Sequence, residues 1–225
     1  MIIDSYEIIN TGDGSHTIQI VNRNITFHST RGAIQESQQV FIDAGFKFFI
    51  EKNPAVKNIR IFEMGLGTGL NALLTAIEAQ RLQKNIEYHT IDLHPLPFNL
   101  FRNLNYAAIT GEPELFHNIS QCAWNVLKTI SPFLKLKKTV AALSDYVFDQ
   151  KFDIIYFDAF APNDQPGLWT EETFKKISEA MNENGVLVTY CSKSVVRKAL
   201  ESAGLTVEKI PGPPGKREVI RALKL

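Results

Sequence analysis

Ile59-Arg-Ile-Phe-Glu-Met-Gly-Leu-Gly-Thr-Gly69 is the stretch that decides the fold of this 225-residue chain. It opens as a mostly apolar run, which is typical of a buried strand, and closes with three glycines at alternate positions. The apolar spacing of a helix follows from Leu70 to Leu82. A strand, a glycine turn and a helix in this order predict a parallel α/β unit whose helix N-terminus is open to a ligand.

The rest of the chain repeats this alternation of strand and helix patterns. Three of the apolar runs end on or near an aspartate, namely Asp92, Asp145 and Asp158. The predicted fold class is therefore α/β, with a doubly wound, mostly parallel, Rossmann-like sheet. Expected strands cover 59–64, 86–91, part of 134–143, 152–157, 186–190, 206–210 and 219–223, and expected helices cover 70–82, 170–181 and 194–203.

Residues 1–57 read as an N-terminal extension packed on the core, and residues 58–225 as the main domain. Within the extension, Thr17–Val21 and Ile25–His28 flank a short polar turn and predict a hairpin, and a helix is expected from Ala33 to Ile50. The connection from about 96 to 133 is far longer than usual. We expect it to be an inserted helical cover beside the site.

Composition excludes several classes of protein. The chain has two cysteines, and its five histidines show no metal-ligand spacing, so no metal is expected. It has no apolar run long enough to span a membrane, and its start lacks a basic segment followed by an apolar one, so we expect a soluble cytoplasmic protein with no membrane partner. Net charge is zero, but residues 191–225 hold eight basic and three acidic side chains. This local excess of positive charge is either a solvated face or a patch for an anionic partner.

The glycine turn leaves two cofactors open. Counted from Gly67, its spacing is Gly-x-Gly-x-x-Ala, which a dinucleotide such as NAD accepts. Glu63, however, would repel a pyrophosphate and could receive the ammonium of a methionine moiety, while the loop N–H groups receive its carboxylate. S-adenosylmethionine carries both groups, and Asp92 at the next strand end would accept the ribose hydroxyls of either cofactor.

Asp158-Ala-Phe-Ala-Pro162 places a carboxylate and an aromatic ring after a continuous apolar strand. Such a carboxylate can hold an amine toward a sulfonium methyl and stabilise the ammonium that forms, which is N-methylation chemistry. Asp145 is either an acceptor for the adenine amino group or a helix N-cap. Lys216 and Arg217 are either phosphate contacts or a solvated pair. Cys191 is interpreted as a small buried residue rather than a nucleophile.

These residues resemble the methyltransferase domain of the bacterial MnmC-type tRNA-modification enzymes and their stand-alone relatives. The resemblance runs from about 32 to 222 and rests on Gly32–Glu36, Glu63–Asn71, Asp158–Pro162 with Leu168-Trp169-Thr170, and Lys216-Arg217-Glu218. It implies a class I S-adenosylmethionine-dependent methyltransferase that methylates the aminomethyl nitrogen at C5 of the wobble uridine of tRNA. The product would be 5-methylaminomethyl-(2-thio)uridine.

The resemblance also implies residue roles and partners. Two-domain members continue into a flavin-dependent domain, and this chain ends at Leu225. We therefore expect only the methyl step here, on an aminomethyl-uridine tRNA that a separate enzyme supplies. The implied catalytic residue is Asp158; the implied cofactor contacts are Glu63, Gly65, Gly67, Thr68, Gly69, Asp92 and Asp145; the implied substrate contacts are Phe160, Pro162, Lys216 and Arg217.

Four other functions stay open at this point. A methyltransferase for a small-molecule amine or a protein, or an aminopropyl transferase, would need the same amine-guiding carboxylate. An NAD-dependent oxidoreductase would use the glycine turn but not Glu63. An RNA-binding module without catalysis would need no Asp158.

Overall fold

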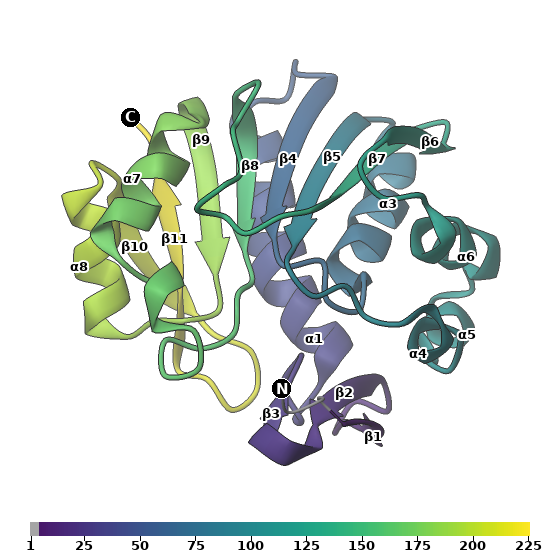
Figure 1. Cartoon of the computed structure of the whole chain (residues 1–225). Helices are drawn as coiled ribbons and strands as arrows, with labels where there is room; N and C mark the ends of the chain where they lie inside the picture. The colour runs from purple at the N-terminus through teal and green to yellow at the C-terminus, as the bar shows by residue number, and fades with distance from the viewer. Residues whose placement is uncertain (1–4) are drawn as a thin grey trace.

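The structure is a computed structural model that describes residues 5–225; residues 1–4, where the predicted extension and its N-terminal segment begin, lie outside the described part. The described chain forms an eight-stranded sheet flanked by helices and a separate three-stranded sheet near its N-terminus (Figure 1). The large sheet is built from β4 (Asn58–Met64), β5 (Asn85–Asp92), β6 (Leu127–Ser131), β7 (Leu134–Val140), β8 (Phe152–Phe157), β9 (Met181–Thr189), β10 (Thr206–Pro211) and β11 (Glu218–Leu223).

The large sheet is mostly parallel, as predicted. Its order is β10-β11-β9-β8-β4-β5-β7-β6, and neighbours from β7 across to β9 run parallel. β11 is antiparallel to both β9 and β10, and β6 is antiparallel to β7. The chain moves outward in one direction from β4 to β7 and returns to the other side of β4 at β8. The topological switch point therefore lies between β4 and β8.

Both faces of this sheet are buried because side chains alternate along each central strand. Ile61 points to the face covered by α3 (Leu70–Leu82) and the helix that begins at Ala33, whereas Phe62 points to the face covered by α7 (Glu171–Glu179) and α8 (Ser194–Ser202). The helices that cover these two clusters, α1 (Ala33–Ser37) with α3 and α7 with α8, lie on opposite faces of the sheet (Figure 1). This is the two-sided burial that a doubly wound α/β fold requires.

The helix expected from Ala33 to Ile50 forms, but its middle is not an α-helix. α1 (Ala33–Ser37) continues into the π-helical segment η2 (Gln38–Lys47) and then into α2 (Phe48–Lys52). Within η2, Gly45 lies against Val188 and Tyr156, where an added Cβ would be 2.9 Å from the Val188 side chain. The helix therefore approaches the sheet closely at this point.

The N-terminal sheet contains the predicted hairpin and one strand that the sequence did not indicate. β2 (His16–Ile20) pairs with β3 (Ile25–Thr26) across the short 3-10 turn η1 (Val21–Arg23). β1 (Tyr6–Asn10) pairs with the other edge of β2. The division into 1–57 and 58–225 stays a proposal.

The long connection after β5 is helical at first and then forms a strand. It contains α4 (Phe98–Arg102), α5 (Tyr106–Thr110) and α6 (Pro113–Gln121), and α6 packs against α3. The following strand, β6, extends the sheet at its edge, which differs from the expected all-helical cover. No helix in residues 5–225 is long and apolar enough to cross a membrane.

Candidate active site

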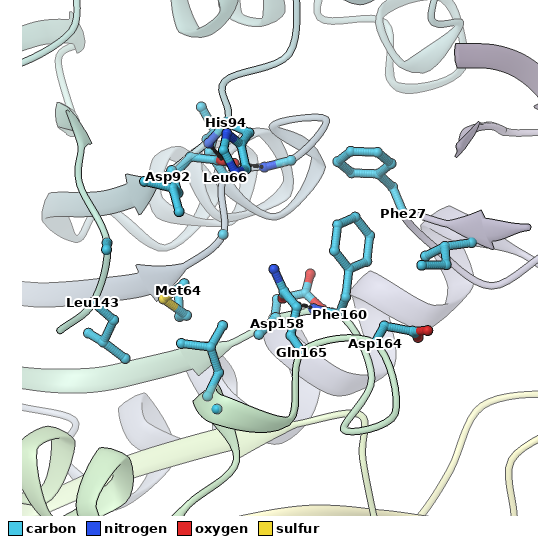
Figure 2. Close-up of a pocket in the computed structure, with 18 of the residues that line it drawn as sticks. Phe27, Met64, Leu66, Asp92, His94, Leu143, Asp158, Phe160, Asp164 and Gln165 are labelled. Carbon is cyan, nitrogen blue, oxygen red and sulfur yellow. Dashed lines mark hydrogen bonds between the residues drawn. The ribbon is translucent and has the colours of Figure 1, made fainter. Parts of the chain in front are cut away.

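A cavity of about 720 Å³ opens at the carboxyl ends of β4, β5 and β8, beside the switch point. Gly65, Gly67, Asp92, Asp158 and Phe160, all predicted from the sequence, line this cavity. Figure 2 shows Asp92 on one side and Asp158 with Phe160 on the other. The structure thus brings together the first part of the glycine turn and both strand-end carboxylates.

The glycine turn has the strained backbone that glycine allows. Gly65 has φ +90°, and a Cβ there would lie 3.1 Å from the Asp158 carbonyl oxygen. The N–H groups of Gly65, Gly67 and Gly69 already donate to protein acceptors. We expected loop N–H groups to receive a ligand carboxylate; those of Leu66 and Thr68, between the glycines, are the ones left for it.

Asp92 lies at the end of β5 and is held by two backbone donors. Gly67 N–H donates to Oδ2 at 3.2 Å, and His94 N–H donates to Oδ1 at 2.9 Å. Burial raises the pKa of this carboxyl, and the two donors partly offset that effect. The carboxylate is therefore fixed in place at the cavity wall, where it can accept hydroxyl donors.

Asn71, the second residue of α3, joins two carboxyl groups. Its Nδ2 donates to Glu63 Oε1 at 3.0 Å and to Asp158 Oδ2 at 2.8 Å. Glu63 is fully buried, its Oε2 has no partner, and burial followed by the charge of Asp158 raises its pKa well above the usual value. Glu63 lies behind the cavity wall rather than on it. Its unpartnered oxygen is an acceptor still available near the glycine turn.

Asp158 follows β8 directly and its backbone N–H donates to Met64 O at 3.1 Å, which fixes it beside β4. Burial, and next the negative charge of Glu36, raise the pKa of Asp158 to about 7. The Asn71 hydrogen bond and the Lys216 ammonium act in the opposite direction. Near neutral pH this carboxyl therefore exchanges a proton readily, as a base that accepts a proton from an amine must.

This pKa predicts how stability depends on pH. An unfolded aspartate has a pKa of about 3.9, so from about pH 4 to 7 the folded protein binds more protons at Asp158 than the unfolded chain, and stability falls as pH rises. A difference of three pKa units corresponds to about 4 kcal/mol. We expect Asp158→Asn to gain unfolding free energy relative to the native protein, up to about this amount, between pH 4 and 7. Urea denaturation at several pH values measures the gain; a pH-independent difference contradicts it.

An aromatic pair closes the cavity next to Asp158. Phe27, from the N-terminal extension, meets the Phe160 ring edge-on at 5.0 Å between centroids. The loop that carries Phe160 is held by Gln165, whose side-chain oxygen accepts from Phe160 N–H, and by Trp169, whose Nε1 donates to Phe160 O at 2.8 Å. Trp169 therefore supports the loop from within the core rather than lining the cavity.

The N-terminal extension also contacts the glycine turn, through the side chain of Thr68. His28 Nε2 hydrogen-bonds to Thr68 Oγ1 at 2.6 Å, and the Tyr106 hydroxyl donates to the same oxygen at 3.4 Å. Burial lowers the pKa of His28 to about 4, so the ring is neutral. The Thr68 side chain is thus a structural contact of the turn; its backbone N–H has no protein partner, and the residue is fully buried outside the cavity lining.

Asp145, Pro162 and Arg217 lie away from the cavity, and Thr68 and Gly69 are also outside its lining. Asp145 is exposed because a turn with Ala142 directs it to solvent, and its carboxylate accepts from Ser144. No helix begins there, so Asp145 is not a helix N-cap, and its contact with adenine stays a prediction; its neighbours Leu143 and Ser144 do line the cavity. Pro162 is half-buried outside the lining, and Arg217 is exposed.

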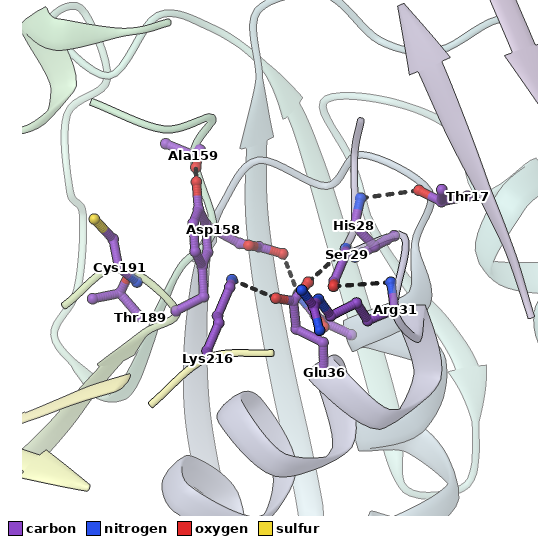
Figure 3. A network of polar contacts seen from close by, with 12 residues as sticks. Thr17, His28, Ser29, Arg31, Glu36, Asp158, Ala159, Thr189, Cys191 and Lys216 are labelled. Atoms are coloured by element: carbon purple, nitrogen blue, oxygen red, sulfur yellow. Dashed lines mark hydrogen bonds and ion pairs between the residues drawn. The ribbon is translucent and has the colours of Figure 1, made fainter. Parts of the chain in front are cut away.

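Lys216 is neither a cavity wall residue nor a solvated one. Its ammonium pairs with Glu36 and lies 4.0 Å from the centroid of the Tyr190 ring (Figure 3).

Sequence reasoning singled out neither Glu36 nor Tyr190 as a site residue, nor Asn71. Asn71 and Glu36 lie inside two of the motifs that carry the resemblance, Glu63–Asn71 and Gly32–Glu36, and this position is what could have marked them as site residues. As interpreted from the sequence, Cys191 is buried, and burial raises its pKa.

Comparison with known proteins identifies the relatives of this chain. Residues 120–225 match a family described as S-adenosyl-L-methionine-dependent methyltransferases. The crystal structure of MnmC2 from Aquifex aeolicus superposes with a TM-score of 0.81 at 27% identity, covering 98% of this chain and 70% of that one. This chain is similar to S-adenosyl-L-methionine-dependent methyltransferases, MnmC2 among them. The cofactor that these similarities indicate is S-adenosyl-L-methionine, and they give no support to the NAD alternative.

MnmC relatives in sequence are longer proteins. The tRNA 5-methylaminomethyl-2-thiouridine biosynthesis bifunctional protein MnmC of Campylobacter hominis is 28% identical over 83% of this chain, which spans 28% of that protein. An uncharacterized protein of Methanocaldococcus jannaschii is 25% identical over 98% of this chain, which spans 60% of it. The chain thus covers only part of the length of these relatives.

The residues present fit S-adenosyl-L-methionine. The orphaned Glu63 Oε2 can accept from the ammonium of a methionine moiety, although a shift at the cavity wall is needed to reach it. The two N–H groups of the glycine turn can donate to its carboxylate, and Asp92 can accept from ribose hydroxyls. Within residues 5–225, no cluster of His, Cys, Asp and Glu side chains could hold a metal ion.

Proposed function

We propose that this protein transfers a methyl group to the aminomethyl nitrogen at C5 of the wobble uridine of tRNA, giving 5-methylaminomethyl-(2-thio)uridine. The observation that carries the proposal is the position of Asp158. Its carboxyl group lies in the cavity between the glycine turn and the Phe27–Phe160 pair, with a pKa of about 7. The MnmC relatives are named for tRNA 5-methylaminomethyl-2-thiouridine biosynthesis, which supports the same substrate.

Asp158 has two tasks in this proposal. The bound cofactor supplies an electrophilic methyl group on a sulfonium. The Asp158 carboxylate accepts an N–H hydrogen bond from the substrate amine, takes the proton that an ammonium must lose, and directs the lone pair of nitrogen toward the methyl group. As the N–C bond forms and the S–C bond breaks, positive charge appears on nitrogen, which the carboxylate stabilises.

Asn71 keeps Asp158 in place during this chemistry. Its amide donates to Asp158 Oδ2, which leaves Oδ1 free to face the amine. Methyl transfer of this kind cannot create the aminomethyl group. An earlier reaction on the tRNA must therefore supply it.

The aromatic pair is proposed to hold the uracil base. Stacking of a base on an aromatic side chain contributes about 1–3 kcal/mol. We expect Phe160→Leu to raise the KM for tRNA about tenfold, with unchanged cofactor affinity, in steady-state methyl-transfer assays. Phe98→Leu, at a partly exposed ring on α4, is the matched control and should leave KM unchanged. Equal effects of both substitutions would remove Phe160 from this role.

The direct test uses labelled S-adenosyl-L-methionine and tRNA from a strain that lacks the final wobble methylation. Nucleoside analysis of the product should show label in 5-methylaminomethyl-type uridine. If the cofactor binds and this tRNA stays unlabelled, the tRNA assignment is wrong. Small-molecule amines, as acceptors of methyl or aminopropyl groups, are then the next substrates to assay.

A further inference from the structure

Lys216 occupies a position built to hold an ammonium group. Its Nζ pairs with Glu36 Oε1 and lies over the face of Tyr190, 4.0 Å from the ring centroid. A carboxylate beside an aromatic face is an arrangement that binds alkylammonium ions through charge and the ring quadrupole. The three side chains come from α1, the segment after β9 and the loop before β11.

The receptor is rigid, whereas its occupant can leave. Glu36 is 6% exposed and its Oε2 accepts from Ser29 N–H at 2.8 Å. The Tyr190 hydroxyl donates to Ala159 O at 2.9 Å, next to Asp158. Lys216, by contrast, lies in the loop 212–217 with 30% of its side chain exposed. Its ammonium can therefore move to solvent without breaking any strand.

Asp158 lines the cavity and lies within electrostatic range of Glu36 and Lys216, which stand just outside the lining. Glu36 and Lys216 both act electrostatically on its carboxyl group, the first raising and the second lowering its pKa. Figure 3 shows the Asp158 and Glu36 side chains directed toward one region, with Lys216 at its side. The buried Glu36 and the partly exposed Asp158 near one ammonium form a site for a single cation, because a second ammonium would meet the first at close range.

We propose that Glu36, Tyr190 and Asp158 form the subsite for the ammonium group of the substrate, and that Lys216 fills this subsite until the substrate displaces it. The inference rests on the proposed function for the identity of the substrate, a primary alkylammonium on a nucleobase. The displaced Lys216 ammonium can then pair with a phosphate group of the substrate.

The first experiment measures the subsite without tRNA. Lys216→Ala empties it, so methylammonium chloride should raise the unfolding temperature of this variant by about 3 °C more than equal potassium chloride does. For the native protein the difference in unfolding temperature between the two salts should be less than about 1 °C, because its own Lys216 fills the site. Lys209→Ala, which removes an exposed lysine paired with Glu218 on the same hairpin, is the matched control and should also show no selective shift.

A double variant assigns the effect to Glu36. Lys216→Ala combined with Glu36→Gln keeps an acceptor for Ser29 but removes the charge, so methylammonium should no longer stabilise it. A selective shift in this double variant, or none in Lys216→Ala alone, overturns the proposal.

The second experiment connects the subsite to the substrate. With S-adenosylhomocysteine present, we expect the native protein to bind aminomethyl-uridine tRNA more tightly than unmodified tRNA, and Glu36→Gln to lower this preference about tenfold. Retained preference in Glu36→Gln refutes the subsite while leaving the proposed function intact. If the native protein methylates no tRNA, the proposed function fails, and the methylammonium shifts alone decide the subsite.

Discussion

Replacing Asp158 by Asn is expected to lower kcat for methyl transfer by at least about 100-fold, the usual contribution of a positioned base. Asn keeps an oxygen that accepts from the Asn71 amide, so the loop should stay in place. It cannot take a proton from an ammonium. Cofactor affinity, measured by calorimetry, should change less than about threefold, because Asp158 acts on the substrate side of the cavity.

The pH profile separates this role from a structural one. Activity requires ionised Asp158, whose pKa is about 7, so kcat/KM of the native protein should fall as pH decreases through 7. The residual activity of Asp158→Asn should lack this limb. Asp149→Asn, at an exposed carboxylate near Lys137, is the control and should keep the native profile. Turnover of Asp158→Asn at the native rate would show that the carboxylate is dispensable.

Gly65→Ala is expected to raise the Kd for S-adenosyl-L-methionine at least tenfold. The φ of +90° is unfavourable for alanine, and its Cβ would lie 3.1 Å from the Asp158 carbonyl oxygen, so the turn or the β8 end must shift. Backbone strain of this kind costs about 1–3 kcal/mol. The shift falls on the cavity wall, where the N–H groups of Leu66 and Thr68 must be placed for a ligand.

Gly204→Ala provides the matched control for this substitution. Gly204 has φ +82°, and no heavy atom lies within 4 Å of an added Cβ. It should therefore lower the unfolding temperature through the same backbone cost but leave the cofactor Kd unchanged in titration calorimetry. If Gly65→Ala lowers the unfolding temperature in the same way but binds the cofactor with the native Kd, then the close approach at Gly65 does not shape the cavity.

Sequence patterns predict the buried part of this fold well. The helix 70–82 and the strand 152–157 form with the predicted bounds, because apolar runs between turn residues leave little choice of register. The strands β1 and β6 were missed because both lie at sheet edges with partly exposed side chains. Their pairing depends on neighbouring strands, which no local pattern encodes.

The candidate site was predictable only where local sequence carries its chemistry. The glycine turn, Asp92 and Asp158 follow strands and can be placed by counting. The contact between Glu36 and Lys216 joins residues 180 positions apart, and neither pattern nor spacing reveals it. Asp145 shows the opposite case, because a strand-end aspartate was expected in the cavity, whereas the structure leaves it exposed and outside the lining.

The position of β11 has a consequence for how the chain reaches its native state. β11 lies between β9 and β10 yet follows every other strand of the sheet in sequence. Until it inserts, the apolar strand β9 presents an open edge whose unpaired N–H and C=O groups can recruit another chain. During synthesis this edge of β9 stays unpaired until residues 218–223 have been made and can pair with it. Crowded, newly made chains are therefore most exposed to mispairing in the interval before the last strand is released.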